Sequence, residues 1–552
     1  MEHSILHALL LTGLITALGG PIAVLWLILP ADRAFGANAG GERFTDSLLL
    51  CAARWTCYGA IAAALATFID FFVQVAELKG QTVFGGADPA IVIKFATVTI
   101  VGRFCLTRMV LLILTAGSTF IRGRRHWWLV AALAWSSVIA SSFVSHAAAQ
   151  PQHRAVAITA QILHISAAAL WMGVLVHLFV VRKLLFSEET PARVAYIAEM
   201  VRRFSPVALV MTSLLGITGL LAASRYLWQV GAIFTSAYGI TLMVKLALLL
   251  PAIYAGFINF KFIRPRLLEI ATGGNGGPSA IGGVLSWFSR TLELEVTSGL
   301  MVVAVAGILA SVSPPAEDGS QRLTSAQTQL LLQPHLPNTD IRGWNLPDDP
   351  RGYVDKDMRW AMFTHNWSGI AVCLMALGWL AQSMRGRIGL WGARLSPFLL
   401  IPFGLFIGFA GDPELWLLHQ VDRWTALTNP ILLEHQIGAA ILFFIAWLTW
   451  RDRKNPEEKR PLGYPLPIVV IIGSLMLLGH AHAITSIPDD LSNLINVEHA
   501  IFGAFGIFAG VTRLLQLRGL LPKTAATCAA YAWPCFILGW GLFMAFFYRE
   551  FV

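Results

Sequence analysis

Apolar stretches of about 20 residues recur along the whole sequence, and this feature constrains the fold more than any other. Each stretch is long enough to cross a hydrocarbon core of roughly 30 Å. In lipid, a spanning segment must satisfy its own backbone hydrogen bonds, so runs this long and continuous form α-helices. The sequence therefore predicts an all-α, polytopic helical membrane protein whose first partner is the lipid bilayer.

The composition agrees with this class and excludes several others. Of the 552 residues, 56% are hydrophobic and only 13% are charged. Soluble domains carry roughly 25% charged residues, so a soluble enzyme, a disordered chain and a nucleic-acid binder are excluded. The formal charge of +9 indicates Lys and Arg retained on the cytoplasmic side of a membrane, with no nucleic acid as partner.

The hydropathy pattern predicts about 14 transmembrane helices. The tenth is short and is interrupted by Pro402 and several glycines. The predicted spans cover about residues 4–30, 46–77, 90–121, 127–147, 155–186, 205–225, 238–262, 290–313, 363–384, 396–411, 430–450, 465–484, 497–516 and 529–548.

The basic residues orient these helices. Lys and Arg concentrate in alternate connections, starting with the connection between the first two spans and continuing after each odd-numbered span. Connections rich in Lys and Arg stay in the cytoplasm. We therefore expect both termini outside, in the periplasm of a Gram-negative cell, and a multi-pass protein of the bacterial inner membrane.

Two blocks of helices are separated by a polar, Pro-rich stretch. Residues 1–313 hold eight predicted spans, and residues 363–552 hold six. Residues 314–362 between them are predicted to form an extracytoplasmic loop or small cap. The expected organisation is therefore eight plus six membrane helices.

Most of the 14 histidines fall in outer loops or in the outer parts of spans. His146 and His164 lie 18 residues apart on successive spans, and His480 and His482 precede His499 in the same way. Such antiparallel hairpins can bring imidazoles together, and imidazole is the commonest metal ligand. Histidine also tolerates a membrane interface for ordinary structural reasons, and chance similarity of the two hairpins competes with the metal interpretation.

Further residues extend the candidate ligand set. His435 and His365 open helices and are followed by small residues, as His499 is. Met358 and Met362 share one helix face with His365, and thioether with imidazole suits Cu(I), although a Met stripe is more often core packing. In the inner half the candidates are few: His177, Met172, Met211, Cys57 and Cys105.

The segment from Leu163 to Gly173 resembles the LHxxAxxxWxG signature of the CopD copper-resistance family. The similarity covers roughly residues 150–315 and includes the pieces Phe204-Ser205, Gly216 to Leu220, Tyr238-Gly239, Leu242, Lys245, Asn259, Pro265, Glu295 and Pro314-Pro315. The resemblance implies an eight-helix inner-membrane copper protein that moves copper inward and works with a periplasmic copper-binding protein of the CopC type. We expect such a partner to be a separate chain.

Four ionisable residues fall within predicted spans, at Lys245, Glu295, Asp70 and Lys94. Lys245 either repels cations, binds a carboxylate or snorkels as a structural lysine. Glu295 lies near the inner end of its span, where we expect it to meet basic cytoplasmic groups. Asp70 and Lys94 lie at similar depth on successive helices, and we expect a structural ion pair between them.

These observations favour a non-enzymatic copper transporter that holds copper at an outer cluster of His and Met residues. Two alternatives remain open. Paired histidines also suit a bis-His b-type haem, which would make the protein an electron carrier. A third possibility is a copper donor or assembly factor without transport.

Overall fold

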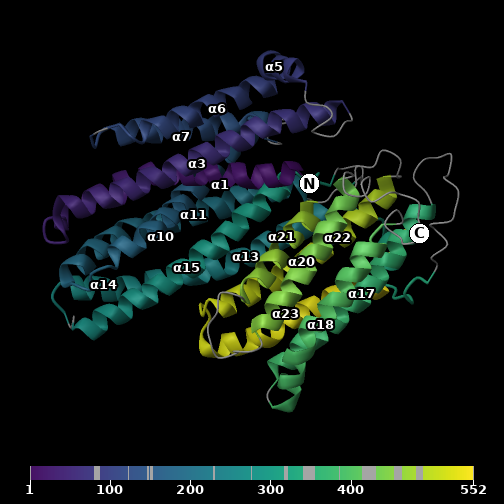
Figure 1. Cartoon of the computed structure of the whole chain (residues 1–552). Helices are drawn as coiled ribbons and strands as arrows, with labels where there is room; N and C mark the ends of the chain where they lie inside the picture. Colours follow the sequence, from purple (N-terminus) through teal and green to yellow (C-terminus); the bar gives the residue numbers. More distant parts are fainter. Residues whose placement is uncertain are drawn as a thin grey trace. The chain divides into compact units, whose positions relative to one another are not determined.

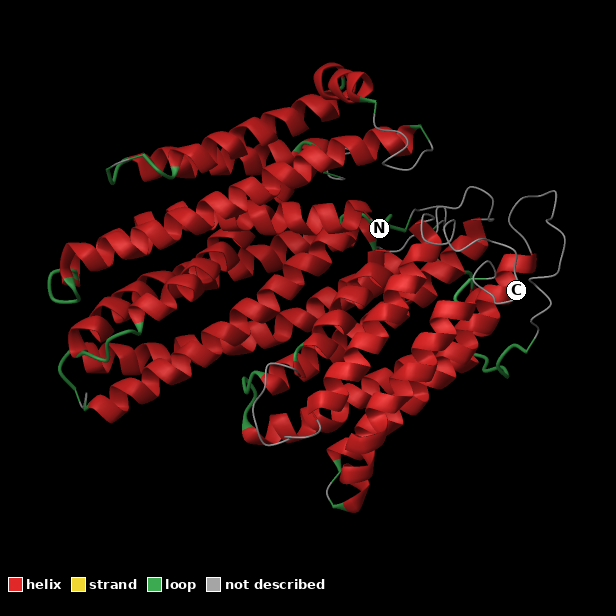
Figure 2. Cartoon of the chain, in the orientation of Figure 1, coloured by secondary structure: helices red, strands yellow, loops and turns green. Residues whose placement is uncertain are grey.

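The computed structural model is helical throughout its described residues, with no strand among them (Figure 2). The all-α prediction is therefore confirmed for this part of the chain. The structure describes residues 2–79, 88–121, 123–145, 148, 153–227, 230–274, 277–315, 321–339, 355–384, 386–412, 430–452, 463–479 and 489–550.

The chain divides into two compact units. Unit 1 comprises Met1–Trp228 and Leu242–Ser311, and unit 2 comprises residues 229–241 and 312–552. Each unit is described by itself below.

Unit 1 is built around α1, which packs against α3, α7, α10, α15 and the π-helical segment η2 (Figure 1). Its helices are α1 (Glu2–Ile22), η1 (Ala23–Ile28), α2 (Leu29–Phe35), α3 (Gly41–Leu78), α5 (Pro89–Val98), α6 (Ile100–Ser118), α7 (His126–Ser142), α9 (Arg154–Ala168), η2 (Ala169–Gly173), α10 (Val174–Leu185), α11 (Pro191–Tyr226), α13 (Ala237–Ile258), η3 (Asn259–Ile263), α14 (Arg264–Ala271) and α15 (Pro278–Leu309).

In unit 2, α17 packs against α18 and α23, and α22 packs against α21 and α23. The helices of this unit are α12 (Ala232–Thr235), α16 (Ser325–Leu331), α17 (Asp355–Ser383), α18 (Arg387–Ala410), α20 (Pro430–Asp452), α21 (Pro465–Gly479), α22 (Asp489–Leu517) and α23 (Lys523–Phe546).

Ten of the described helical segments are long and apolar enough to cross a membrane. Every one of the predicted spans overlaps a helix of the structure. The spans predicted at 127–147 and 465–484 correspond to α7 and α21, which have 17 and 15 residues. The chain is a polytopic helical membrane protein.

Glycine allows the helices at the centre of unit 1 to touch backbone to backbone. A Cβ at Gly19 would overlap the backbone of Gly173, and a Cβ at Gly173 would overlap the carbonyl oxygen of Ile15. Small residues of this kind permit close helix packing where lipid supplies no hydrophobic driving force. The η2 segment therefore lies directly against α1.

Three π-helical segments interrupt the long helices of unit 1. η1 joins α1 to α2, η2 joins α9 to α10, and η3 joins α13 to α14. A π-bulge adds a residue to the helical turn and turns the following side chains to a new direction, often at a functional site. η2 includes Trp171 and Met172 of the signature segment, and η3 begins at Asn259.

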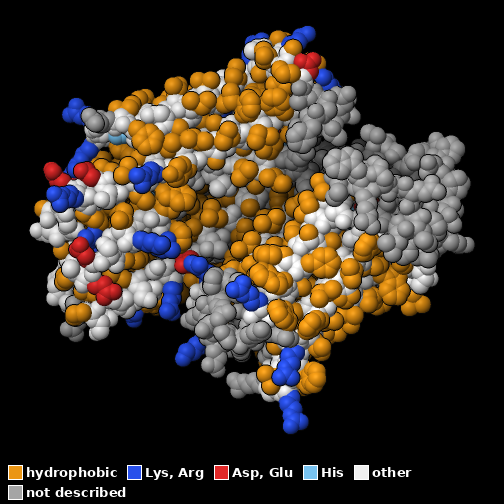
Figure 3. Space-filling model, in the orientation of Figure 1, with side chains coloured by type: hydrophobic (Ala, Val, Ile, Leu, Met, Phe, Trp, Pro, Cys, Tyr) orange, Lys and Arg blue, Asp and Glu red, His pale blue; other side chains and the backbone are white. Residues whose placement is uncertain are grey.

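On the face drawn in Figure 3, apolar side chains cover much of the described surface of each unit. On α11, for example, Leu209, Ile217 and Leu220 are exposed by 61%, 66% and 73%. In unit 1, Lys and Arg gather around the ends of α10, α14 and α15 (Figure 3), including Arg182 and Lys183 in the last turn of α10. This distribution suits helices whose sides face lipid and whose ends face water.

We predict that Gly173→Val destabilises unit 1, because the added side chain would have to occupy the position of the α1 backbone. Overpacking of this kind lowers the free energy of unfolding by about 1–3 kcal/mol. Thermal unfolding in detergent, followed by size-exclusion chromatography, measures the effect.

Gly117→Ala is the matched control, since a Cβ at this exposed position of α6 meets nothing within 4 Å. It should raise stability by roughly 0.5–1 kcal/mol through the lower backbone entropy of alanine. Equal stability of Gly173→Val and the native chain would contradict the close approach of α1 and η2.

Candidate functional site

Close contact between α17 and α23 positions His365. A Cβ at Gly369 would overlap the backbone nitrogen of Ala545, so the two helices meet at glycine. His365 lies one turn before Gly369, and Tyr548 lies one turn after Ala545. The rings of His365 and Tyr548 consequently stack, with centroids 4.2 Å apart and an interplanar angle of 24°.

A second histidine, His499 of α22, approaches the same place. Its ring lies edge to face with His365, at a centroid distance of 5.8 Å and an interplanar angle of 82°. Phe502, one turn further along α22, contacts both histidines and Tyr548. His499 is only 5% exposed, so the pair is held in an aromatic, largely buried environment.

Backbone hydrogen bonds fix the orientation of both imidazoles. The Nδ1 atoms of His365 and His499 lie 2.7 Å and 2.8 Å from the carbonyl oxygens of Ala361 and Ile495. A carbonyl only accepts, so each Nδ1 carries the proton and donates it. In the neutral ring the lone pair is then on Nε2, which is the arrangement that metal-binding histidines use.

Two buried acidic residues are close to the histidine pair: Glu498 immediately precedes His499, and Glu550 contacts Tyr548. Glu498 is fully buried, and its Oε1 accepts a hydrogen bond of 2.9 Å from the backbone N–H of Arg549. Among the described residues, Glu498 Oε2 has no hydrogen-bond partner. The hydroxyl of Tyr548 donates to Glu550, which is 4% exposed. A buried carboxylate requires a proton, a cation or hydrogen bonds to offset its desolvation.

The segment Gln333–Asn338 crosses the ends of the same helices. The backbone N–H of His335 donates to the carbonyl of Phe546, and its Nε2 lies 2.9 Å from the carbonyl of Tyr548. The backbone N–H of Asn338 donates to Asn366 Oδ1 at 2.9 Å. These bonds hold part of the predicted cap against the residues that surround the histidine pair.

His164 takes a different position, in unit 1. Its Nδ1 lies 2.8 Å from the hydroxyl oxygen of Thr218 on α11, and the ring lies beside Gly219. Lys245 of α13 is close enough to interact with it electrostatically. The signature histidine therefore faces α11 and α13.

Glu295 lies at the centre of a polar cluster formed by residues of the resemblance. Asn259 Nδ2 donates to Glu295 Oε2 at 2.9 Å, and Trp171 Nε1 donates to Oε1 at 3.4 Å. Thr291 donates to Asn259 Oδ1 at 2.5 Å. The expected contact with basic cytoplasmic groups is wrong, because η2 and η3 turn Trp171 and Asn259 toward this carboxyl group, which is 4% exposed.

His177 is buried one turn beyond η2. Its Nδ1 donates to the carbonyl of Gly173 at 2.9 Å, and its Nε2 lies 3.4 Å from the hydroxyl of Thr56 on α3. Met172, on the same helix, contacts Gly299 of α15 through its sulfur. The inner-half candidates His177 and Met172 are thus core residues in contact with α3 and α15.

The remaining predicted residues are distributed over both units. Met358 and Met362 share α17 with His365, and Met362 is 8% exposed. His435 Nδ1 lies 2.5 Å from Asp412 Oδ2. Cys57 and Cys105 are buried free cysteines, and Met211 packs at the edge of the unit 1 core.

The expected ion pair between Asp70 and Lys94 is wrong. Asp70 Oδ1 lies 3.0 Å from His3 Nδ1, and Gln74 donates to Oδ2 at 2.5 Å. Lys94 is exposed on α5. The start of α1 packs against the end of α3, and this contact brings His3 to Asp70. The sequence analysis had expected Lys94 in that place.

Three predicted ligands, His146, His480 and His482, lie outside the described residues. The duplicated histidine hairpin therefore stays a prediction. In the described part of the chain, no three His, Cys, Asp or Glu side chains converge in a way that could hold a metal ion. Instead, the structure brings together His365 and His499, which the sequence analysis had not paired.

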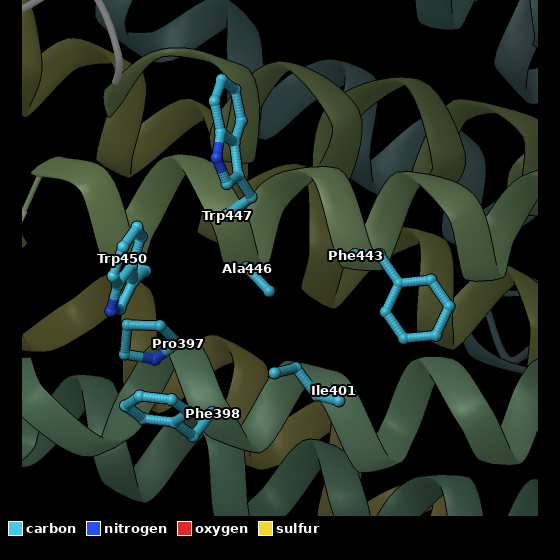
Figure 4. Close-up of a pocket in the computed structure, with 7 residues that line it drawn as sticks. All are labelled: Pro397, Phe398, Ile401, Phe443, Ala446, Trp447 and Trp450. Carbon is cyan, nitrogen blue, oxygen red and sulfur yellow. The ribbon is translucent and has the colours of Figure 1, made fainter.

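A cavity of about 330 Å³ lies between α18 and α20 (Figure 4). Its lining is apolar and aromatic, so it offers no ligand set for a metal ion and is not the candidate site. The residues are Pro397, Phe398, Ile401, Phe443, Ala446, Trp447 and Trp450.

Comparison with known proteins supports the resemblance found in the sequence. Residues 198–309 match the family model described as copper resistance protein D, and residues 3–156 match the model of the copper resistance protein D-like N-terminal domain. In these two segments the chain is similar to the CopD copper resistance family. The family likeness thus extends beyond residues 150–315, to the start of the chain.

One curated relative of this chain is the copper transport protein CutJ of Bacillus subtilis (strain 168). The two are 28% identical over 299 residues, which is 51% of this chain and 51% of CutJ. The chain therefore spans about half the length of that relative. No solved structure matches the chain significantly.

We predict that Asn259→Leu destabilises unit 1 by about 1–3 kcal/mol, because it removes the buried hydrogen bonds that Asn259 makes with Glu295 and Thr291. Thermal unfolding in detergent measures the loss. In a double-mutant cycle with Glu295→Gln, the two effects should be smaller together than their sum. Simple additivity would contradict a direct interaction.

Proposed function

We propose that this protein takes up copper at the outer side of a bacterial inner membrane and moves it inward. The observation that carries the proposal is the His365–His499 pair, whose Nδ1 atoms are anchored on backbone carbonyls. Similarity to the CopD family and the likeness to a protein named for copper transport support it. The activity is transport, with no chemical reaction catalysed.

The proposed topology has 14 spans in an eight-plus-six arrangement with both termini outside. Support comes from the ten long apolar helices and from the Lys and Arg residues at the ends of α10 and α14. With this topology, His365, His499 and His164 lie toward the outer side. These histidines would then bind the ion on the side from which copper arrives, the periplasm of a Gram-negative cell.

The chemistry of the pair suits copper. Neutral imidazole nitrogen binds copper well, and the thioethers of Met358 and Met362 on the same helix favour Cu(I). Transport requires several modest sites instead of one tight cage, because the ion must also leave. His146, His480, His482 and His435 remain candidate ligands along this outer face.

Unit 1 supplies candidate groups for the inward step. His164, Met172, His177 and Glu295 lie within its helices, and three of them are buried. A periplasmic copper-binding protein of the CopC type, as a separate chain, would deliver copper to the outer face. Mutagenesis of these residues and reconstitution with such a partner would test the inward step.

The perpendicular imidazoles of His365 on α17 and His499 on α22 also favour a second function, the ligation of a b-type haem by these two residues. Such a protein would transfer electrons. A copper donor or assembly factor would bind copper at the same pair without moving it across the bilayer.

The metal and pigment content of the purified protein separates these functions. We expect copper by elemental analysis and no Soret band in the absorption spectrum. A Soret band that sharpens on reduction would replace transport by electron transfer. Copper binding without copper flux in proteoliposomes would assign the donor or assembly role.

We predict that His365→Ala and His499→Ala each lower the amount of bound copper, because each removes one nitrogen ligand of the pair. His164→Ala should do the same if the signature histidine is a second site. Bound copper is measured by elemental analysis after equilibrium dialysis.

The control is His153→Asn, which changes an exposed histidine at a positive φ of 54° that asparagine tolerates. It should bind as much copper as the native protein. Unchanged copper in both His365→Ala and His499→Ala would remove the pair from the copper site.

A further inference from the structure

Two histidines at the start of α1 form a second pair, in unit 1. His3 and His7 are one helical turn apart, and their rings stack with centroids 5.9 Å apart and an interplanar angle of 19°. Side chains at positions i and i+4 share one face of a helix, and two histidines at this spacing can bind one metal ion. The sequence singled out neither residue as a ligand.

Helix packing fixes what each of the two histidines meets. A Cβ at Gly13 would lie 2.6 Å from the carbonyl oxygen of Gly59, so α1 and α3 run in close contact and Asp70 reaches the start of α1. On the other side, a Cβ at Gly307 would overlap the backbone of Ala8. Ser311, one turn beyond Gly307, is thereby placed beside His7.

Both rings are anchored through Nδ1. His3 Nδ1 lies 3.0 Å from Asp70 Oδ1, and His7 Nδ1 lies 2.8 Å from the hydroxyl oxygen of Ser311. An ionised carboxylate only accepts, so the proton of a neutral His3 is on Nδ1 and its lone pair is on Nε2. Gln74 donates to the other oxygen of Asp70 and holds the carboxylate in place. A carboxylate that orients a histidine in this way is typical of metal sites.

A buried arginine lies near the carboxylate that orients His3. The side chain of Asp70 is 8% exposed, and the guanidinium of Arg108 is close enough to interact with it electrostatically. Arg108 is 3% exposed and donates to Thr67 at 3.0 Å. Arg108 thus offsets part of the desolvation of the buried Asp70 carboxylate.

We infer that His3 and His7 form a copper(I) site at the N-terminal end of α1, oriented by Asp70 and Ser311. Copper(I) accepts two nitrogen ligands, whereas a structural zinc ion takes four. The inference rests on the proposed copper transport, to which it adds an ion site in unit 1 that is separate from the His365–His499 pair.

The test is an anaerobic Cu(I) titration of the full-length protein in detergent against a chromophoric copper(I) chelator. His3→Gln/His7→Gln should bind one ion fewer than the native protein, while His365→Ala/His499→Ala retains that ion. Asp70→Asn should lower the affinity for this ion by about 10–100-fold without abolishing its binding, as loss of an orienting carboxylate does. His153→Asn is the control and should match the native protein.

The outcomes separate this inference from the proposed function. If the native protein binds no copper, the proposed function fails. If it binds copper, but His3→Gln/His7→Gln binds the same number of ions with the same affinity, only the inference fails. Should the double variant not fold, Asp70→Asn decides, since an unchanged affinity in that variant overturns the inference.

Discussion

Backbone-to-backbone contact between helices, allowed by glycine, determines where the polar groups of this protein meet. Gly19 and Gly173 bring η2 against α1, and Gly307 brings α15 against Ala8. In unit 2, Gly369 brings α17 against α23. In lipid such contacts replace the hydrophobic effect as the source of specific helix association. Each places a polar side chain one turn away beside a partner from another helix.

Several histidines of the described chain are held through Nδ1. His177, His365 and His499 each donate from Nδ1 to the carbonyl four residues earlier, and His3 uses Nδ1 toward Asp70. This arrangement satisfies one polar atom locally and leaves Nε2 as the acceptor nitrogen. It therefore suits both a stable apolar interior and metal binding. Which of these two roles a histidine has depends on what surrounds its Nε2 atom. The Nε2 atom of His177 lies near the Thr56 hydroxyl, whereas the ring of His365 contacts the rings of Tyr548 and His499.

The signature residues of the CopD family acquire a physical explanation from the π-helical segments. Trp171 lies in η2, Asn259 begins η3, and both donate to the carboxyl group of Glu295. Regular α-helices would direct these side chains differently, because a π-turn shifts every following residue around the helix axis. The residues of the motif are thus spaced along the chain so that their side chains meet in a buried polar cluster around Glu295.

The sequence alone determined the helical class, the approximate spans and the candidate metal-binding residue types. These follow from local properties, since hydropathy is read along the chain and an apolar segment in lipid must be a helix. The pairing of side chains was not determined in this way. Asp70 was assigned to Lys94 and meets His3, Glu295 was assigned to basic residues and meets Asn259, and His365 with His499 was not foreseen. Only the tertiary structure decided these pairs, because they depend on which helices approach within backbone contact and on where a π-turn rotates a helix.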